Sequence, residues 1–353
     1  MKTIEPKNKW HVNEVAIYGT HCDIVKEKVR QIQSWCNYRR LAYIDASHRE
    51  EPSVELEQLT THSDYFEIQT QQVMDETLLL EFDGAVVNGN HHRASKQVVY
   101  LNVEKESSLR KRFSELTQVE AIVLPTSLTE VPAFAWEGVS KNTRIIIEGS
   151  EEEFQFWRNQ FPTPELKALI LVGGMSSRMG EEKGLIHYQE KAQVEVLSNL
   201  FASLGIESYL SCRPEQVSLY ESFNIPFVFD QVQGGPLGGI LSALRSFPQT
   251  AFLVVACDLP NLNAATLKDL LARRQPKSYA TCFESPMDGG PEPLCSIYEP
   301  KSASALAQVW ANGKNCPRKM LFNRNVTIVP ISNKEYLANA NTPEDRAQFY
   351  QKA

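Results

Sequence analysis

The sequence has no apolar run long enough to cross a lipid bilayer. Its longest runs, residues 168–172 and 251–256, have the length of β-strands, whereas a membrane-spanning helix needs about 20 consecutive apolar residues. Residues 1–19 also lack the apolar segment that a secretory signal requires. We therefore expect a cytoplasmic protein that does not bind membranes.

Paired cysteines are missing as well. The chain has seven cysteines, an odd number, and they are widely scattered with no Cys-x-x-Cys pair. This pattern argues against a disulfide framework and against a structural zinc site of the usual spacing. We expect the cysteines to be reduced, as is usual in the cytoplasm.

The chain also lacks an excess of positive charge. Its 36 lysines and arginines are outnumbered by 43 aspartates and glutamates, which gives a formal net charge of −7. Proteins that bind nucleic acids usually present a basic surface, so nucleic acid is not an expected partner. A nucleotide is not excluded, because a small anionic ligand needs only a few basic groups in one cleft, helped by a divalent metal.

The length of 353 residues suggests two domains. The best boundary is the segment 161–165, because its two prolines, two residues apart, cannot lie inside a helix. We therefore predict an α/β accessory domain over residues 1–160 and a second domain over residues 165–353.

The second domain alternates segments typical of strands and helices, which predicts a doubly wound, mainly parallel, Rossmann-like α/β sheet. Its expected strands cover residues 168–172, 207–212, 226–229, 251–256, 278–283, 293–297 and 326–330. Its expected helices lie near residues 192–204, 214–222, 238–246, 264–274, 301–311 and 316–322. The first half is predicted to be a separate α/β domain, with strands near 14–18, 41–45, 84–88, 97–103, 120–124 and 143–147 and helices near 22–36, 105–116 and 150–160.

The loop after the first strand of the second domain carries the strongest chemical signal. Gly173 and Gly174 allow a sharp turn, whose backbone N–H groups, with Ser176 nearby, form a cradle for an anion. Arg178 can bind phosphate oxygens through two parallel hydrogen bonds, and Lys183 adds a mobile positive charge. The spacing matches neither a P-loop nor the usual dinucleotide-binding motif. We expect a polyphosphate site; the alternative is an ordinary strand-to-helix turn.

Three further clusters fall at the ends of predicted strands. Asp230 precedes a glycine-rich turn that contains Gly235 and opens a helix. Asp258 ends a buried strand, and one carboxylate together with substrate phosphates is a normal way to hold Mg²⁺. Asn339 and Asn341 precede the last expected helix as polar ligands. An ordinary turn or helix cap is the alternative for each cluster.

Together, the segments LVGGMSSRMGEEKG, GGPLGGI, CDLP and NANTPED resemble the MobA-like nucleotidyltransferases, and among them the molybdenum cofactor guanylyltransferase family. The resemblance covers residues 167–353. It implies binding of GTP and Mg²⁺, and transfer of GMP to the terminal phosphate of molybdopterin with release of pyrophosphate. It also suggests molybdoenzymes or their chaperones as partners.

The resemblance implies roles for individual residues. The implied catalytic residues are Arg178, Lys183 and Asp258. The implied nucleotide-binding residues are Gly173, Gly174, Ser176, Arg178, Lys183, Asp230, Gly235 and Asp258, with Asp230 helping to recognise the nucleoside. The implied metal ligands are Asp258 and Asn341. No general base is needed, because a phosphate nucleophile is already ionised at neutral pH.

Two positions depart from the family's pattern. Glu182 stands where the family usually has aspartate, and no asparagine lies near Leu210, where guanine-selective members tend to have one. The alternatives are therefore cytidylyl or other nucleotidyl transfer to a different phosphorylated acceptor, and a non-catalytic nucleotide-binding or cofactor-binding scaffold. Cytidylyltransferase relatives, however, usually begin their loop with AAG and lack the PLxG[IM] turn, which favours GTP.

The first half weakly resembles a degenerate MobB-type P-loop domain. A strand, a short loop at Gly19 and Thr20 and a helix follow in that order, but the GK[ST] motif is missing. We therefore expect no GTP hydrolysis in this half. The adjacent histidines His91 and His92 are expected to lie in a solvated loop.

Overall fold

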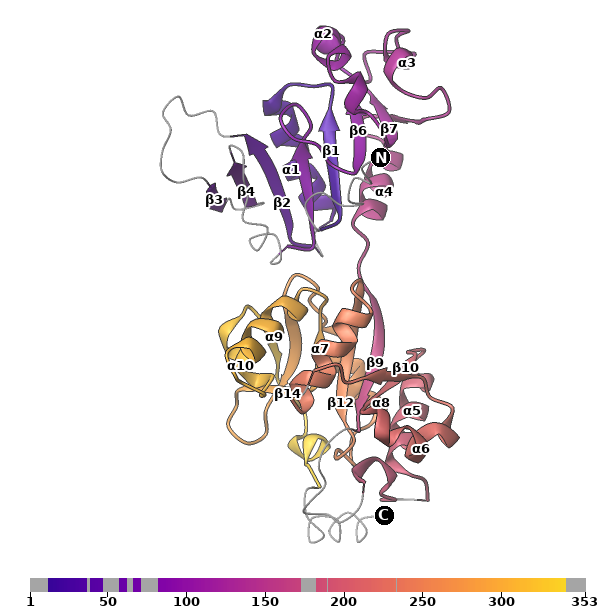
Figure 1. Ribbon diagram of the computed structural model, residues 1–353, viewed down its shortest axis with the longest axis vertical. Helices are drawn as coiled ribbons and strands as arrows, with labels where there is room; N and C mark the ends of the chain where they lie inside the picture. The colour runs from indigo at the N-terminus through magenta and orange to yellow at the C-terminus, as the bar shows by residue number, and fades with distance from the viewer. Residues whose placement is uncertain are drawn as a thin grey trace. The chain divides into compact units, whose positions relative to one another are not determined.

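The computed structural model describes most of the chain. The described residues are 12–36, 39–46, 57–61, 66–70, 82–172, 182–188, 190–232 and 234–340. The chain divides into two compact units, one up to Thr163 and one from Pro164 onward (Figure 1). Among the described residues, no helix has both the length and the apolar character needed to span a membrane.

The first unit is built around a mostly parallel sheet with the strand order β3-β4-β2-β5-β1-β6-β7-β8. Only β3, paired with β4, runs antiparallel among its described strands. The strands are β1 (Glu14–Tyr18), β2 (Leu41–Ala46), β3 (Glu57–Thr61), β4 (Phe66–Thr70), β5 (Gly84–Asn88), β6 (Lys96–Tyr100), β7 (Val119–Leu124) and β8 (Arg144–Ile147).

Helices cover both faces of this sheet. The helix α1 (Cys22–Trp35) repeats apolar residues at Val25, Val29 and Ile32, so they form one stripe that packs on the sheet beside α4 (Glu151–Gln160). The short helices α2 (Glu106–Arg110) and α3 (Ala135–Gly138) contribute to the apolar cluster on the opposite face.

The second unit contains a seven-stranded sheet in its described part, with the order β11-β10-β9-β12-β14-β13-β15. The strands are β9 (Glu165–Leu171), β10 (Ser208–Cys212), β11 (Phe227–Phe229), β12 (Thr250–Ala256), β13 (Ala280–Glu284), β14 (Pro291–Tyr298) and β15 (Thr327–Val329). All are parallel except β14, which runs antiparallel to β12 and β13. The direction of β14 follows from the short connection after β13, because a short turn can join only antiparallel neighbours.

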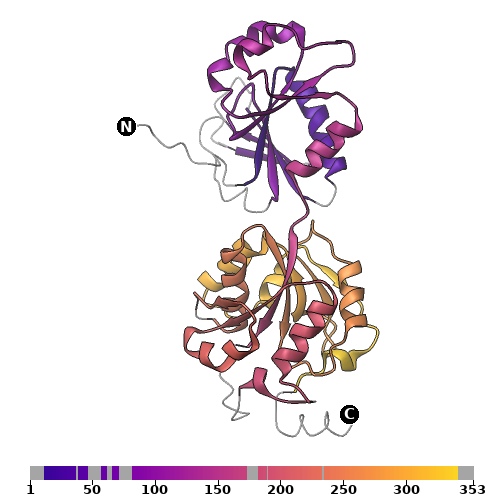
Figure 2. The same cartoon turned by 90° about the vertical axis from the view of Figure 1, so that its right-hand side faces the viewer.

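The second unit is also covered on both faces (Figure 2). One apolar cluster unites α5 (Gln193–Ser203), α6 (Val217–Tyr220) and α8 (Ala264–Ala272) with the sheet. The other unites α7 (Pro236–Ser246), α9 (Ser302–Ala311) and α10 (Arg318–Asn323) with the opposite face. This two-sided covering forces the functional groups to the edge where the parallel strands end, because both faces are occupied.

The predicted α/β class and the doubly wound, mainly parallel sheet of the second unit are confirmed. The prediction missed β3 and β4, whose sequences EQLTT and FEIQT contain too few apolar residues to stand out as strands. It also left the position of β14 in the sheet open, since strand order depends on contacts between distant segments.

Candidate functional site

Asp258 is the centre of the candidate site. The strand β12 is buried along its whole length, and Asp258 follows it by two residues at the carboxyl edge of the sheet, with only 10% of its side chain exposed. Its backbone oxygen accepts a hydrogen bond from the Ala340 N–H at 2.9 Å. This bond ties the end of β12 to the segment that precedes the last predicted helix.

Two polar side chains contact the Asp258 carboxylate from distant parts of the sequence. The ammonium group of Lys183 lies 2.9 Å from Oδ2, and the Asn339 side-chain amide donates to Oδ1 at 3.2 Å. Three of the four clusters predicted from the sequence therefore meet at one carboxylate. A capping or turn role for Asp258 alone would not require either contact.

Lys183 is held in place by the residues beside it. It begins a 3₁₀ turn, Lys183–Leu185, in which a Cβ on Gly184 would lie 2.9 Å from the hydroxyl of Tyr220. The preceding Glu182 accepts a hydrogen bond from the Gln216 side chain at 3.2 Å. Glu182, the departure from the family's aspartate, thus anchors the end of the loop to the region of α6.

Asp230 forms a second polar centre at the end of β11. The Ser211 hydroxyl, on the neighbouring strand β10, donates a hydrogen bond to Asp230 Oδ1 at 2.6 Å. Burial raises the pKa of the Asp230 carboxyl, and the hydrogen bond from Ser211 and the positive charge of Arg213 oppose that shift. The site therefore holds a carboxylate that gains from additional N–H donors.

The glycine-rich turn makes room for this centre. A Cβ on Gly239 would lie 2.3 Å from Ser211 Oγ and 3.3 Å from Asp230 Oδ1, so no larger residue fits there. Gly235, with a φ of +56°, precedes Pro236 at the start of α7. Its left-handed conformation is one that residues with a side chain rarely adopt, and it lets the chain turn directly into the helix.

Position 210, near which guanine-selective members tend to have an asparagine, belongs to the core of the second unit. The side chain of Leu210 is fully buried in the cluster beneath α5, facing away from Asp230. Its neighbour Ser211 points to the other face, because successive side chains on a strand alternate. Asp230 is the residue expected to help recognise the nucleoside. The residue of β10 that contacts it is Ser211, and not Leu210.

Glu292 is a candidate that the sequence analysis missed. Val255 of β12 pairs with Cys295 of the antiparallel strand β14, so the start of β14, where Glu292 lies, runs beside the end of β12. Burial raises the pKa of Glu292, and the Asp258 charge adds to the shift. The only sequence signal is a glutamate at the start of a strand, and it becomes informative once the antiparallel direction of β14 is known.

The described residues contain no group of three or more His, Cys, Asp or Glu side chains that could hold a metal ion by themselves. Asp258 and Glu292 nonetheless fit the way in which Mg²⁺ is usually bound, through one or two carboxylates together with substrate phosphates and water. The predicted residues Gly173, Gly174, Ser176, Arg178 and Asn341 lie outside the described residues, so their roles stay predictions.

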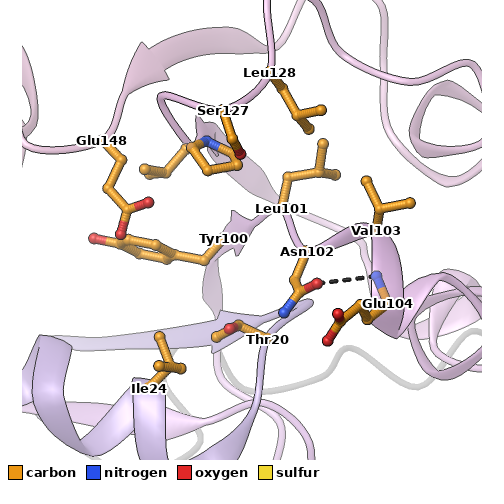
Figure 3. A pocket seen from close by; sticks show the side chains of 12 residues that line it. Thr20, Ile24, Tyr100, Leu101, Asn102, Val103, Glu104, Ser127, Leu128 and Glu148 are labelled. Atoms are coloured by element: carbon orange, nitrogen blue, oxygen red, sulfur yellow. Dashed lines mark hydrogen bonds between the residues drawn. The ribbon is translucent and has the colours of Figure 1, made fainter.

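In the first unit, different residues lie at the edge where the parallel strands end. A cavity of about 400 Å³ lies at the carboxyl ends of β1, β6, β7 and β8, where Thr20, Asn102 and two carboxylates, Glu104 and Glu148, line it (Figure 3). Lys28 pairs with Glu148 at 2.7 Å and does not itself line the cavity. The cavity lining therefore combines one lysine-paired carboxylate, Glu148, with the carboxylate of Glu104.

Comparisons with known proteins place the second unit in a nucleotidyltransferase family. The profile of the MobA-like NTP transferase domain matches residues 168–327. A molybdenum cofactor biosynthesis bifunctional protein of Synechocystis is 32% identical over 258 residues, covering 71% of this chain and 72% of the relative. The chain belongs to the molybdenum cofactor guanylyltransferase family. Within that family, a probable molybdenum cofactor guanylyltransferase of Nostoc is 31% identical over 52% of this chain and 89% of its own length.

Membership of this family makes the chain a nucleotidyltransferase of molybdenum cofactor biosynthesis. A solved structure, molybdopterin-guanine dinucleotide biosynthesis protein A of Archaeoglobus fulgidus, is 25% identical with a TM-score of 0.45, covering 53% of this chain and 97% of that one. The match to the bifunctional protein spans 258 residues and is longer than the second unit, so it extends into the first unit.

Proposed function

We propose that this protein transfers GMP from GTP to the terminal phosphate of molybdopterin and releases pyrophosphate. The observation that carries the proposal is the meeting of Lys183, Asn339 and Asp258 at the carboxyl edge of the second sheet. A phosphate oxygen of molybdopterin forms a bond to the α-phosphorus of GTP while the bond to the β-phosphate oxygen breaks. The electron pair of that bond leaves with pyrophosphate.

The side chains at the edge would position and neutralise the triphosphate. A divalent cation, Mg²⁺ in our proposal, would be held by Asp258 with Glu292 nearby and would supply positive charge to the phosphates. Lys183, now paired with Asp258, can turn to a phosphate oxygen when the cation takes its place at the carboxylate. Asn339 keeps Asp258 oriented throughout. Such positioning accounts for most of the catalysis in phosphoryl and nucleotidyl transfer.

Residues of the preceding loop complete the proposed site. Arg178 would share the negative charge of the triphosphate with Lys183, and the backbone at Gly173 and Gly174 would approach the phosphates closely, beside Ser176. Asn341 would contact phosphate or metal. These roles rest on the family resemblance and on the chemistry of the residue types.

Asp230 would recognise the base. A guanine edge offers two neighbouring N–H donors to a carboxylate, whereas cytosine offers one amino group. The half-buried carboxyl of Asp230 receives only one described side-chain donor, Ser211, and a guanine would supply the rest. Gly235 and the turn around it leave open space in front of α7 for the nucleoside.

We further propose that the first unit is a MobB-like accessory domain that docks partners or delivers substrate without hydrolysing GTP. Molybdoenzymes or their chaperones are the proposed recipients of the product. The absence of a GK[ST] motif in the sequence supports this role. Hydrolysis would release orthophosphate from GTP, whereas transfer releases pyrophosphate, so assaying both products in the full chain separates the two activities.

The proposal is tested by pyrophosphate release from GTP, CTP, ATP and UTP, each with molybdopterin and Mg²⁺. We expect release from GTP to exceed that from the other three, to stop with a chelator and to return with added Mg²⁺. A preference for CTP would overturn the guanylyl assignment. Tight GTP binding without any pyrophosphate release would instead indicate the non-catalytic scaffold.

A further inference from the structure

A cluster of reactive side chains lies in the first unit at the start of α1, where Cys22 stands between two residues that line the cavity, Thr20 and Ile24. Cys22 is the first residue of α1, and its Sγ lies 3.3 Å from Nε2 of His91, which follows β5. The same Nε2 lies 3.8 Å from Oδ1 of Asp45, near the end of β2. The cluster thus joins three segments at the edge where the parallel strands end. His91 lies in a turn after β5, as expected of a loop residue, but its side chain is only 25% exposed and so partly buried.

The carboxylate of this cluster is fixed by its neighbours. Asp45 accepts hydrogen bonds from the Tyr43 hydroxyl at 2.8 Å, the Asn88 amide at 3.0 Å and the Ala46 N–H at 2.8 Å. Its side chain is only 1% exposed. A buried carboxylate that is held in this way favours a positive charge on the imidazole next to it.

Two further groups lie close to the Cys22 thiol, the Asn90 amide and the N-terminus of α1. The Asn90 amide lies 3.8 Å from Cys22 Sγ and also donates to the Thr20 carbonyl at 2.9 Å, which fixes the start of α1. Sγ therefore lies at the N-terminus of a 14-residue helix, where the helix dipole favours negative charge. Each of these contacts stabilises a thiolate relative to a thiol.

The hydrogen bond between Cys22 and His91 is the largest influence on the pKa of both groups. The hydrogen bond from His91 lowers the pKa of Cys22, and burial and the Asp45 charge oppose this only in part. The same hydrogen bond raises the pKa of His91, against burial and the positive charge of Arg112. Both shifts favour the ion pair of a thiolate and an imidazolium over the neutral pair.

The geometry distinguishes between two uses of such a pair. In a hydrolytic triad the acid holds one ring nitrogen while the other nitrogen faces the nucleophile. Here Nε2 of His91 faces both Cys22 and Asp45. The imidazolium is thus placed to stabilise a thiolate, and it is not placed to shuttle a proton for acyl transfer.

We propose that Cys22 is a thiolate that is modified by low-molecular-weight disulfides, with His91 as its positioning residue. The thiolate sulfur attacks one sulfur of the disulfide, a new S–S bond forms to Cys22, and the old S–S bond breaks. Its electron pair leaves on the second sulfur as a thiolate. No other oxidant is needed, and a second small thiol reverses the reaction.

The chain supplies its own control for this proposal. All seven cysteines are free, and Cys316 is the exposed one, whereas Cys22 is half-buried and the other five lie in the interior or nearly so. Accessibility alone therefore predicts that Cys316 reacts first. A faster reaction at Cys22 has to come from its surroundings.

The test uses the full chain, limited iodoacetamide and peptide mass spectrometry between pH 5.5 and 9. We expect Cys22 to be alkylated at least about threefold faster than Cys316 at pH 7, because a larger thiolate fraction outweighs lower intrinsic nucleophilicity. The His91→Gln variant should be alkylated at Cys22 more slowly by a similar factor. The pH dependence of its Cys22 alkylation rate should move to higher pH. Cys316→Ser should leave the Cys22 rate unchanged.

Oxidised glutathione then probes the disulfide reaction itself. We expect one glutathionyl group on Cys22, none on the Cys22→Ser variant, and release by dithiothreitol. The proposal is overturned if Cys316 reacts as fast as Cys22 in the unaltered chain, a comparison that requires no variant to fold. It is equally overturned if His91→Gln leaves the profile unchanged, or if iodoacetamide labels Cys22 and glutathione disulfide does not.

Discussion

The two units share an architecture and differ in the side chains gathered at the edge where their strands end. Each has a mostly parallel sheet covered by helices on both faces. In the second unit Lys183 and Asn339 both contact Asp258, whereas in the first unit Glu148 pairs with Lys28 beside a cavity that Glu104 also lines. The fold thus provides the place for a ligand, and a few side chains decide which ligand it admits.

The largest expected effect comes from neutralising Asp258. Asp258→Asn should lower pyrophosphate release by about 10²–10³-fold, because it removes the carboxylate that binds the metal and orients Lys183. The matched control is Asp269→Asn, on α8, where an exposed aspartate pairs with Arg273. Equal rates in the two variants would place the reaction somewhere other than this edge.

Removing the positive charge of Lys183, at the edge of the second unit where the strands end, should have the next largest effect on activity. Lys183→Gln should reduce pyrophosphate release about 10–100-fold and weaken GTP binding, since the side chain neutralises the triphosphate in our proposal. Lys191→Gln, an exposed lysine that pairs with Glu195, is the control. If Lys183→Gln behaves like this control in a titration with GTP, the contrast between the two edges does not depend on Lys183.

A third prediction concerns the space in front of Asp230. Gly239→Ala should cost about 1–3 kcal/mol of unfolding free energy, because the new Cβ would lie 2.3 Å from Ser211 Oγ. Thermal denaturation of the single variant measures the loss. Adding Ser211→Ala removes the clashing oxygen and should restore part of it, whereas purely additive losses would contradict the packing argument.

The smallest effect is expected in the first unit, at the edge where its parallel strands end. Glu148→Gln breaks the ion pair with Lys28 and should lower stability by about 1 kcal/mol or less, with no change in pyrophosphate release. Chemical denaturation and the pyrophosphate assay are measured on the same preparation. A clear loss of activity would mean that the edges of the two units are coupled, and the comparison above would need revision.

Much of the fold could be predicted because its signals are local. The stretch Ala251–Ala256 is apolar throughout, and it is a buried strand in the structure. The polar strands β3 and β4 lack such a signal and were missed. The direction of a strand in the sheet has no such local signal. The sequence indicated a strand over 293–297, but only its pairing with β12 shows that this strand is antiparallel.

The residues of the candidate site also fall into those that the sequence predicted and those that it did not. Asp258, Lys183 and Asp230 were predicted because carboxylates and basic residues at strand ends have a recognisable chemistry. Glu292 and Ser211 were not predicted, because their roles come from neighbours on other strands. The contacts of His91 were not predicted for the same reason, since its partners Cys22 and Asp45 are distant in the sequence.

The sequence by itself determined the α/β class, the order of the elements, the motifs of the second unit and the lack of a P-loop motif in the first. The tertiary structure decided which of those motifs meet: Lys183 and Asn339 on Asp258, Ser211 on Asp230, and Cys22 on His91. Local propensities depend on neighbours along the chain. Hydrogen bonds and ion pairs act over a few ångströms in space, and only the folded sheet brings such distant residues that close.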